Sequence, residues 1–261
     1  MTPWTPFPHD ASPYRHDEAT LRRHWQRLHA GDVEPLPEAF PVLAAWALFH
    51  AGEFQRATEA GLAAVADALP AGLAVANRAQ LVYATYLEKG EAVRQTLFLA
   101  VAERAGRRAT EAPDDVAAWY ALAYSLGRYA QSISVATALA QGLGIKIRQC
   151  LETTIRLAPG HAEAHLALGA FHAEIIDKVG SLLGRTQGAS KDAGLTAFRT
   201  ALRLAPDSPV VKVEFARGLV MLEGDKCQDE ATALCHAAAA CEPLDAIERL
   251  QVEMARAELE D

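Results

Sequence analysis

Three histidines stand close together in the segment APGHAEAHLALGAFHAE, and their spacing allows a metal site. His161, His165 and His172 are separated by four and seven residues. On a helix with 3.6 residues per turn, these steps place all three side chains within an arc of about 40°. Because two histidines at positions i and i+4 can bind zinc, a metal-binding protein is one hypothesis for this chain.

The surrounding residues favour a packing role for the same histidines. Leu168 lies inside the same arc, and the order HAEAH differs from the HExxH order of zinc-dependent peptidases. The sequence also contains neither a GxxxxGK[ST] loop nor a catalytic triad motif with supporting local context. We therefore expect no metal, no cofactor, no catalytic residue and no enzymatic activity.

The histidines belong to a series of segments whose ends are marked by proline. Pro113, Pro159, Pro206 and Pro243 each follow a stretch with apolar residues at helical spacing, as in LETTIRLAP and FRTALRLAP. Proline cannot continue a helix, so each one marks a stop before the next helix begins. The chain is therefore predicted to be all-α.

Within this frame the sequence resembles the tetratricopeptide repeat (TPR), a helix pair that recurs about every 34 residues. The packing positions of one such pair are matched by His165, Leu168, Gly169, His172, Gly194, Phe198, Ala201 and Pro206. The resemblance implies a right-handed α-α superhelix of about five irregular pairs, in which the histidines fill packing positions. Small residues at helix crossings let the two helices approach closely.

Two central repeats are longer than the family pattern. Pro113 to Pro159 spans 46 residues and Pro159 to Pro206 spans 47, so each carries about a dozen extra residues. Both extra segments are amphipathic, and we expect them to project from one edge and pack together as a wall or lid. The expected divisions are an N-terminal arm and first helix at 1–34, a TPR-like superhelical domain at 35–243 with insertions near 127–146 and 175–193, and a capping helix at 244–261.

The resemblance also implies which residues line a concave groove. Carried over by position, they are Trp46, Phe49, Tyr120, Tyr124, Arg128, Leu166, Ala170, Glu174, Glu214, Arg217 and Met221. The family's carboxylate clamp uses Lys, Arg and Asn, whereas most of these residues are aromatic or apolar and the chain has one asparagine, Asn77. We therefore expect a non-enzymatic scaffold or adaptor that binds a protein segment in this aromatic and apolar groove.

A small hydrophobic ligand is the alternative occupant of the groove. The stretch LGAFHAEIIDKVGSLLGRTQGASKDAGLTAFRTALRLAPDS is similar to a region of the regulator-of-microtubule-dynamics proteins and to the T-component proteins of tripartite periplasmic transporters. The second similarity implies a carrier in which the insertions close over an apolar ligand. Either the groove or the insertion edge could also support a homodimer.

The bulk composition limits the other partners. A formal net charge of −8 argues against nucleic acid, whose phosphates require a basic face. No apolar run reaches the length that spans a bilayer, and the first residues lack the basic and apolar regions of a secretion signal. The sequence therefore predicts a cytoplasmic protein, and its alanine-rich, asparagine-poor composition is typical of a GC-rich bacterium.

Overall fold

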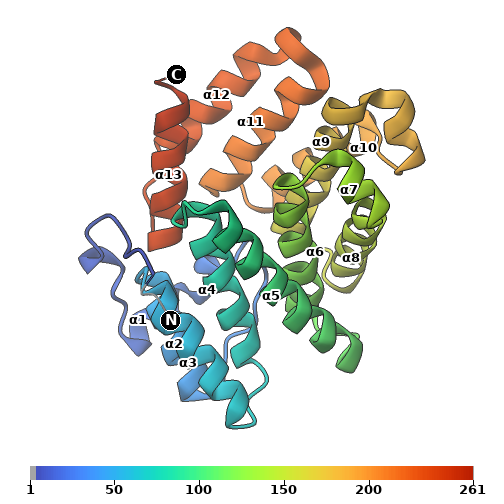
Figure 1. The fold of residues 1–261 in the computed structure, drawn as a ribbon. Helices are drawn as coiled ribbons and strands as arrows, with labels where there is room; N and C mark the ends of the chain where they lie inside the picture. The colour runs from blue at the N-terminus through green and yellow to red at the C-terminus, as the bar shows by residue number, and fades with distance from the viewer. Residues whose placement is uncertain (1–3, 261) are drawn as a thin grey trace. The chain divides into compact units, whose positions relative to one another are not determined.

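The computed structural model describes residues 4–260, and every regular element in that range is a helix (Figure 1). The helices are η1 (Ser12–Tyr14), α1 (Glu18–Leu28), α2 (Phe40–His50), α3 (Phe54–Ala66), α4 (Gly72–Tyr86), α5 (Glu91–Glu111), α6 (Val116–Gln131), α7 (Val135–Ala140), α8 (Leu143–Leu157), α9 (Ala162–Thr186), α10 (Lys191–Leu204), α11 (Pro209–Glu223), η2 (Gly224–Cys227), α12 (Gln228–Ala239) and α13 (Ala246–Glu258). None of the helices between residues 4 and 260 combines the length and apolarity that crossing a bilayer requires.

The chain divides into two compact units, and each is built from separate stretches of sequence. Unit 1 contains the residues up to His29 together with Glu34–Ser132 and Leu244–Ile247. Unit 2 contains Ala30–Val33, Ile133–Pro243 and the residues from Glu248 onward. Both units therefore depend on a short piece of chain that is remote in sequence from their main body.

Unit 1 is a succession of antiparallel helix neighbours. Helix α2 packs against α3, α3 against α4, and α5 against α6, while α4 also contacts α6. Helices α3 and α4 approach closely at Gly61, which has no side chain. A Cβ atom at this position would lie 2.6 Å from the carbonyl oxygen of Gly72. Local signals fix the start of α6, where the Asp115 side chain accepts a hydrogen bond from the Ala118 amide as an N-cap.

Unit 2 repeats the same arrangement around a phenylalanine pair. Helix α9 packs against α10 and α11, and α11 packs against α12. Phe198 on α10 is fully buried and stacks on Phe215 with ring centroids 5.4 Å apart. A Cβ atom on Gly169 would lie 2.8 Å from the Phe198 ring, so this glycine permits the approach of α9 to α10 that the repeat pattern predicts.

The two predicted insertions contain a short helix and the second half of a long one. Near 127–146, α6 is followed by α7, whose N-cap Ser134 accepts a hydrogen bond from the Thr137 amide. Near 175–193, α9 continues to Thr186 through a non-helical residue, Gly180, at φ 77° and ψ 162°. Glycine accepts this positive φ without steric cost, so it allows the helix to change direction there.

The two ends of the chain pack on different units. The N-terminal arm lies on unit 1, where the Trp4 indole stacks on Tyr83 at a centroid distance of 4.1 Å. Helix α13 occupies the segment expected to cap the repeats, and its Ala255 packs with Val213 and Ala238 in unit 2. The arm and the last helix are therefore integral parts of the packed structure.

Candidate functional site

The three histidines that suggested a metal site have separate partners. His161 is the N-cap of α9, and its Nδ1 accepts a hydrogen bond of 3.1 Å from the Ala164 amide. The Nε2 atom of His165 lies 3.1 Å from the carbonyl oxygen of Pro159. Nδ1 of the buried His172 lies 3.3 Å from the Ser190 amide nitrogen, which donates to it. Across residues 4–260 no three His, Cys, Asp or Glu side chains are grouped so that they could hold a metal ion.

Trp46 and Phe49 were expected to line a groove, but the structure places both in the core of unit 1, with exposed fractions of 1% and 2%. The cause is α1 and the residue after it, which cover this face of α2. The Trp25 ring meets Trp46 edge-on at 5.8 Å, and the His29 ring does so at 4.7 Å. The sequence predicted a helix before the repeats, but it contained no local signal that this helix, α1, packs against α2.

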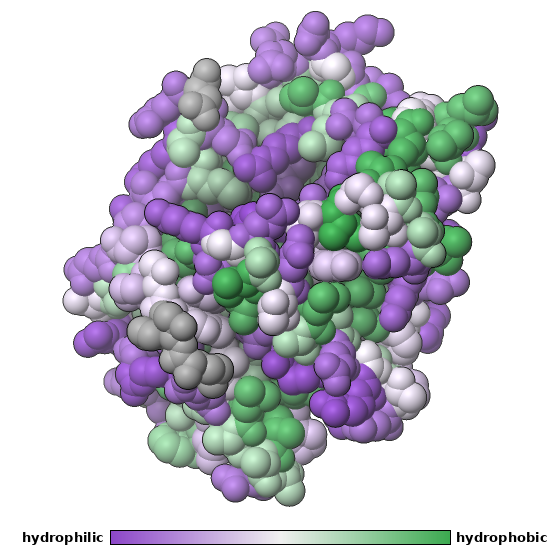
Figure 2. Space-filling view, in the orientation of Figure 1, coloured by the Kyte–Doolittle hydropathy of each residue, from purple (hydrophilic) through white to green (hydrophobic). Residues whose placement is uncertain are grey.

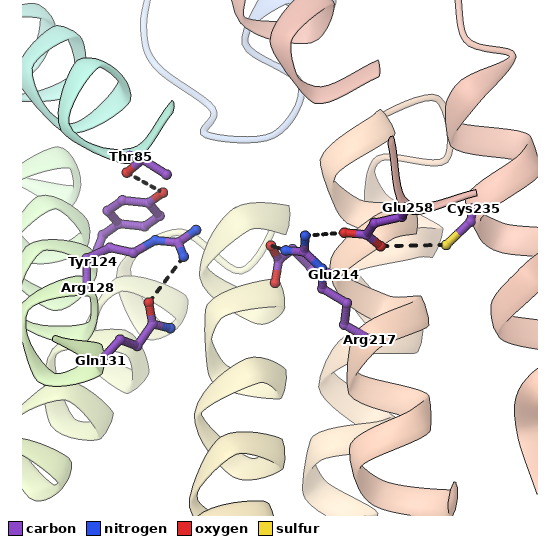
Figure 3. Close-up of polar contacts among 8 residues, drawn as sticks. All are labelled: Thr85, Tyr124, Arg128, Gln131, Glu214, Arg217, Cys235 and Glu258. Atoms are coloured by element: carbon purple, nitrogen blue, oxygen red, sulfur yellow. Dashed lines mark hydrogen bonds and ion pairs between the residues drawn. The ribbon is translucent and has the colours of Figure 1, made fainter. Parts of the chain in front are cut away.

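The part of the predicted groove that reaches the surface of unit 1 lies on α6. Tyr120 is buried, and its ring lies 5.9 Å from that of the half-buried Tyr124. The Tyr124 hydroxyl lies 3.3 Å from the Thr85 hydroxyl on α4, so this tyrosine joins two neighbouring helices (Figure 3). The Arg128 guanidinium lies over the Tyr124 ring at 5.1 Å and donates to Gln131. An aromatic ring and a cation are thus fixed together on one helix face.

In unit 2 the predicted residues divide between core and surface. Leu166 is buried in the cluster around Phe198, and the half-buried Ala170 packs against that cluster. Glu174, one turn further along α9, lies 3.7 Å from Lys178. The upstream half of this helix face therefore stabilises the fold, while its downstream half carries paired charges.

A charged cluster covers the exposed face of α11. Arg217 donates to Glu214 at 2.9 Å and also forms an ion pair with Glu258 of α13 (Figure 3). The Cys235 thiol lies 4.0 Å from Glu258, and burial together with that carboxylate raises the pKa of this thiol. Met221 follows one turn later and is exposed. This face therefore presents an acidic pair around one arginine beside an apolar side chain.

The segments predicted to be insertions carry several exposed apolar side chains. Leu182 is 80% exposed and Leu183 is 54% exposed on the second half of α9. Val135 and Leu139 on α7 and Ile145 on α8 are exposed too. Figure 2 shows apolar side chains gathered over the region in which Figure 1 draws α7 and the end of α9. Exposed apolar residues that gather on one surface are typical of interaction sites.

Two further polar clusters have no counterpart in the sequence analysis. In one, His50 Nδ1 donates to Asp245 at 2.8 Å and His50 Nε2 lies 3.3 Å from His29 Nε2, all three residues being buried. In the other, the Arg104 guanidinium lies against Asn77 and Gln80. In each cluster the contacts join residues more than 20 positions apart, so no spacing rule connects them.

These helix pairs define an all-α, TPR-like helical-repeat fold, and the comparisons with known proteins agree. No family model and no curated protein matches the sequence. Among solved structures the chain is similar to TTC0263, a thermophilic TPR protein of Thermus thermophilus. The two chains share 19% sequence identity with a TM-score of 0.60, over 83% of this chain and 97% of that one. The predicted resemblance to TPR proteins is therefore confirmed for the fold.

Proposed function

We propose that this chain is a non-enzymatic interaction scaffold that binds a segment of another protein on the α6 face around Tyr124 and Arg128. The observation that carries the proposal is the pairing of these two side chains, with the guanidinium 5.1 Å from the ring centroid. Tyrosine and arginine are the residue types that dominate the binding energy of protein interfaces. The stacking on Arg128 and the hydroxyl contact with Thr85 hold the tyrosine in place before a partner arrives.

The partner segment suited to this face carries apolar and acidic side chains. An apolar side chain would cover the exposed part of the tyrosine ring, and a carboxylate would meet the cation. Because a charged hydrogen bond is strongest when it is shielded from water, the apolar contact and the ion pair would reinforce each other. The α11 face of unit 2 is a different kind of surface, because Arg217 already pairs there with Glu214 and Glu258.

Selection from a phage-displayed library of random 12-residue peptides tests this proposal. We expect the full chain to enrich peptides with apolar and acidic residues, and the Tyr124→Ala/Arg128→Ala variant to bind them at least tenfold more weakly. Lys89→Ala removes one exposed cation from the same unit and should leave binding unchanged. Circular dichroism checks that the double variant is folded. Equal binding by the folded double variant would contradict the proposal.

A carrier for a small apolar ligand is the second candidate, and the exposed leucines of the α9 insertion favour it. Native mass spectrometry of the chain purified from the expressing cells tests this function directly. An adduct with the mass of an apolar compound, lost in the Leu182→Ser/Leu183→Ser variant, would support the carrier. A bare polypeptide mass would leave the peptide-binding scaffold as the function that the geometry supports.

A further inference from the structure

Arg104 on α5 is a half-buried cation without a carboxylate partner. Its Nε donates to Asn77 Oδ1 at 3.1 Å, and its Nη2 donates to Gln80 Oε1 at 2.8 Å. Within residues 4–260 no acidic side chain forms an ion pair with this guanidinium. Charged groups that leave water are normally paired with an opposite charge, so two neutral amides are an unusual environment for it.

The two amides are themselves buried, with exposed fractions of 2% for Asn77 and 5% for Gln80. An arginine can only donate hydrogen bonds, so both amides must turn their oxygens toward it. Each amide then directs its NH2 group elsewhere. Gln80 donates to the carbonyl oxygen of Leu97 at 2.8 Å, whereas the Asn77 NH2 group has no acceptor among the described residues. Because this NH2 group is not among the buried unpartnered side-chain atoms of the described residues, it reaches solvent and can meet a ligand.

A second cation adds to this surplus of donors. Arg107 follows one turn along α5, is exposed, and has no carboxylate partner in the described part of the chain. Burial first, and then the charge of Arg107, lower the pKa of Arg104, while Glu103 opposes this effect. The cluster thus combines two guanidinium groups and an amide donor, and no carboxylate of the described residues forms an ion pair with either guanidinium.

We propose that Arg104, Arg107 and Asn77 form a binding site for an oxyanion. A phosphate, sulfate or carboxylate group accepts several hydrogen bonds at once and supplies the missing negative charge. Asn77 and Gln80 hold the guanidinium plane in advance, so little side-chain freedom is lost when the anion binds. The site uses none of the α6 residues proposed to bind a protein segment. A negative result for one proposal therefore does not contradict the other.

Isothermal titration calorimetry with sodium phosphate, at constant ionic strength, tests the site on the full chain. We expect saturable binding of phosphate to the unmodified chain. Binding should be at least tenfold weaker in Asn77→Asp, because the new carboxylate would form an ion pair with Arg104 at almost unchanged side-chain volume. Arg107→Ala changes an exposed residue and should also weaken binding. The control Arg199→Gln removes one exposed cation from α10 and should bind phosphate like the unmodified chain.

Two results would overturn the proposal. One is equal phosphate affinity of the unmodified chain and Asn77→Asp, and the other is the absence of saturable binding for phosphate, sulfate and acetate alike. A tenfold or greater preference for phosphate over acetate would identify a free phosphorylated ligand as the source. Equal binding of acetate would identify a carboxylate group of a partner chain. The melting temperature of Asn77→Asp without phosphate should exceed that of the unmodified chain, since the variant satisfies the guanidinium internally.

Discussion

At the scale of single residues, His172 shows how a residue with chemical potential can serve packing. Its ring is buried, and its Nδ1 accepts a hydrogen bond from the amide of Ser190, the N-cap of α10. Burial is the main cause that lowers the pKa of His172, the charge of Arg148 adds to the effect, and Glu152 opposes it. The neutral ring is therefore the form that fits this position.

The depressed pKa predicts a loss of stability in acid. Below the ordinary histidine pKa of about 6.5, His172 binds a proton in the unfolded chain but stays neutral in the folded chain. The free energy of unfolding therefore falls as pH decreases. The contribution of this group cannot exceed about 1.4 kcal/mol per pH unit. Urea denaturation at pH 7 and pH 5 should show a smaller loss in His172→Asn, which keeps an acceptor near Nδ1 but does not titrate. An identical loss in both chains would assign the acid sensitivity to other groups.

The sequence predicted which residues pack within a repeat better than which residues are covered by distant parts of the chain. Gly169 and Phe198 were placed correctly because helix packing follows a local repeat. Trp46 and Phe49 were misplaced because their burial depends on α1, which precedes the repeats and follows no periodic pattern. Asp245 and His50 could not be connected at all, since 195 residues separate them and neither belongs to a motif.

At the scale of elements, glycines set how closely the helices of unit 2 approach. A Cβ atom on Gly218 of α11 would lie 2.2 Å from the Phe198 ring, which is itself fixed by stacking on Phe215. Because close-packed interiors contain few voids, we expect this fully buried ring to have little room to move. The proline stops predicted the ends of α5, α8, α10 and α12, but the Gly180 break inside α9 had no comparable signal.

Substitution of this glycine should therefore destabilise the fold. We expect Gly218→Ala to lower the free energy of unfolding by about 1–3 kcal/mol through overpacking. Gly127 on α6 is the matched control, because no heavy atom lies within 4 Å of the Cβ position apart from its chain neighbours and the nearby backbone of its own helix. Gly127→Ala should be neutral or stabilise the protein by up to about 1 kcal/mol, since alanine is the better helix former. Chemical denaturation of both variants measures the difference, and equal effects would refute the packing argument.

At the scale of the whole molecule, each unit is completed by a short segment that is remote in sequence from its main body. We call Ala30–Val33 and Leu244–Ile247 the exchanged segments. Leu244–Ile247 belongs to unit 1, and its Asp245 accepts a hydrogen bond from the buried His50. Unit 2 in turn receives Ala30–Val33, where the Gly31 carbonyl accepts a hydrogen bond of 2.9 Å from the Glu163 amide. A family pattern of consecutive helix pairs does not predict such exchange.

The Asp245 contact should stabilise helices far away in sequence. Asp245→Ala leaves the buried Nδ1–H of His50 without this acceptor, which should cost about 1–3 kcal/mol. Asp245→Asn keeps an acceptor oxygen at the same place and should cost less. Hydrogen exchange, followed by mass spectrometry, should show loss of protection in α2 for the alanine variant. Unchanged protection in α2 would show that the hydrogen bond between Asp245 and His50 does not stabilise this helix.

The exchanged segments also impose an order on biosynthesis. A ribosome delivers residues in sequence, so unit 1 lacks one of its pieces until Leu244–Ile247 has emerged, after residues 133–243 of unit 2 have been made. Unit 2 contains Ala30–Val33, which is made before residues 34–132 of unit 1, and this piece must wait for the rest of its unit. Neither unit can mature early while the other is still being made. A gene fragment encoding only the main body of one unit would therefore lack that unit's remote segment. For the same reason, recombination between genes cannot exchange the units as independent modules.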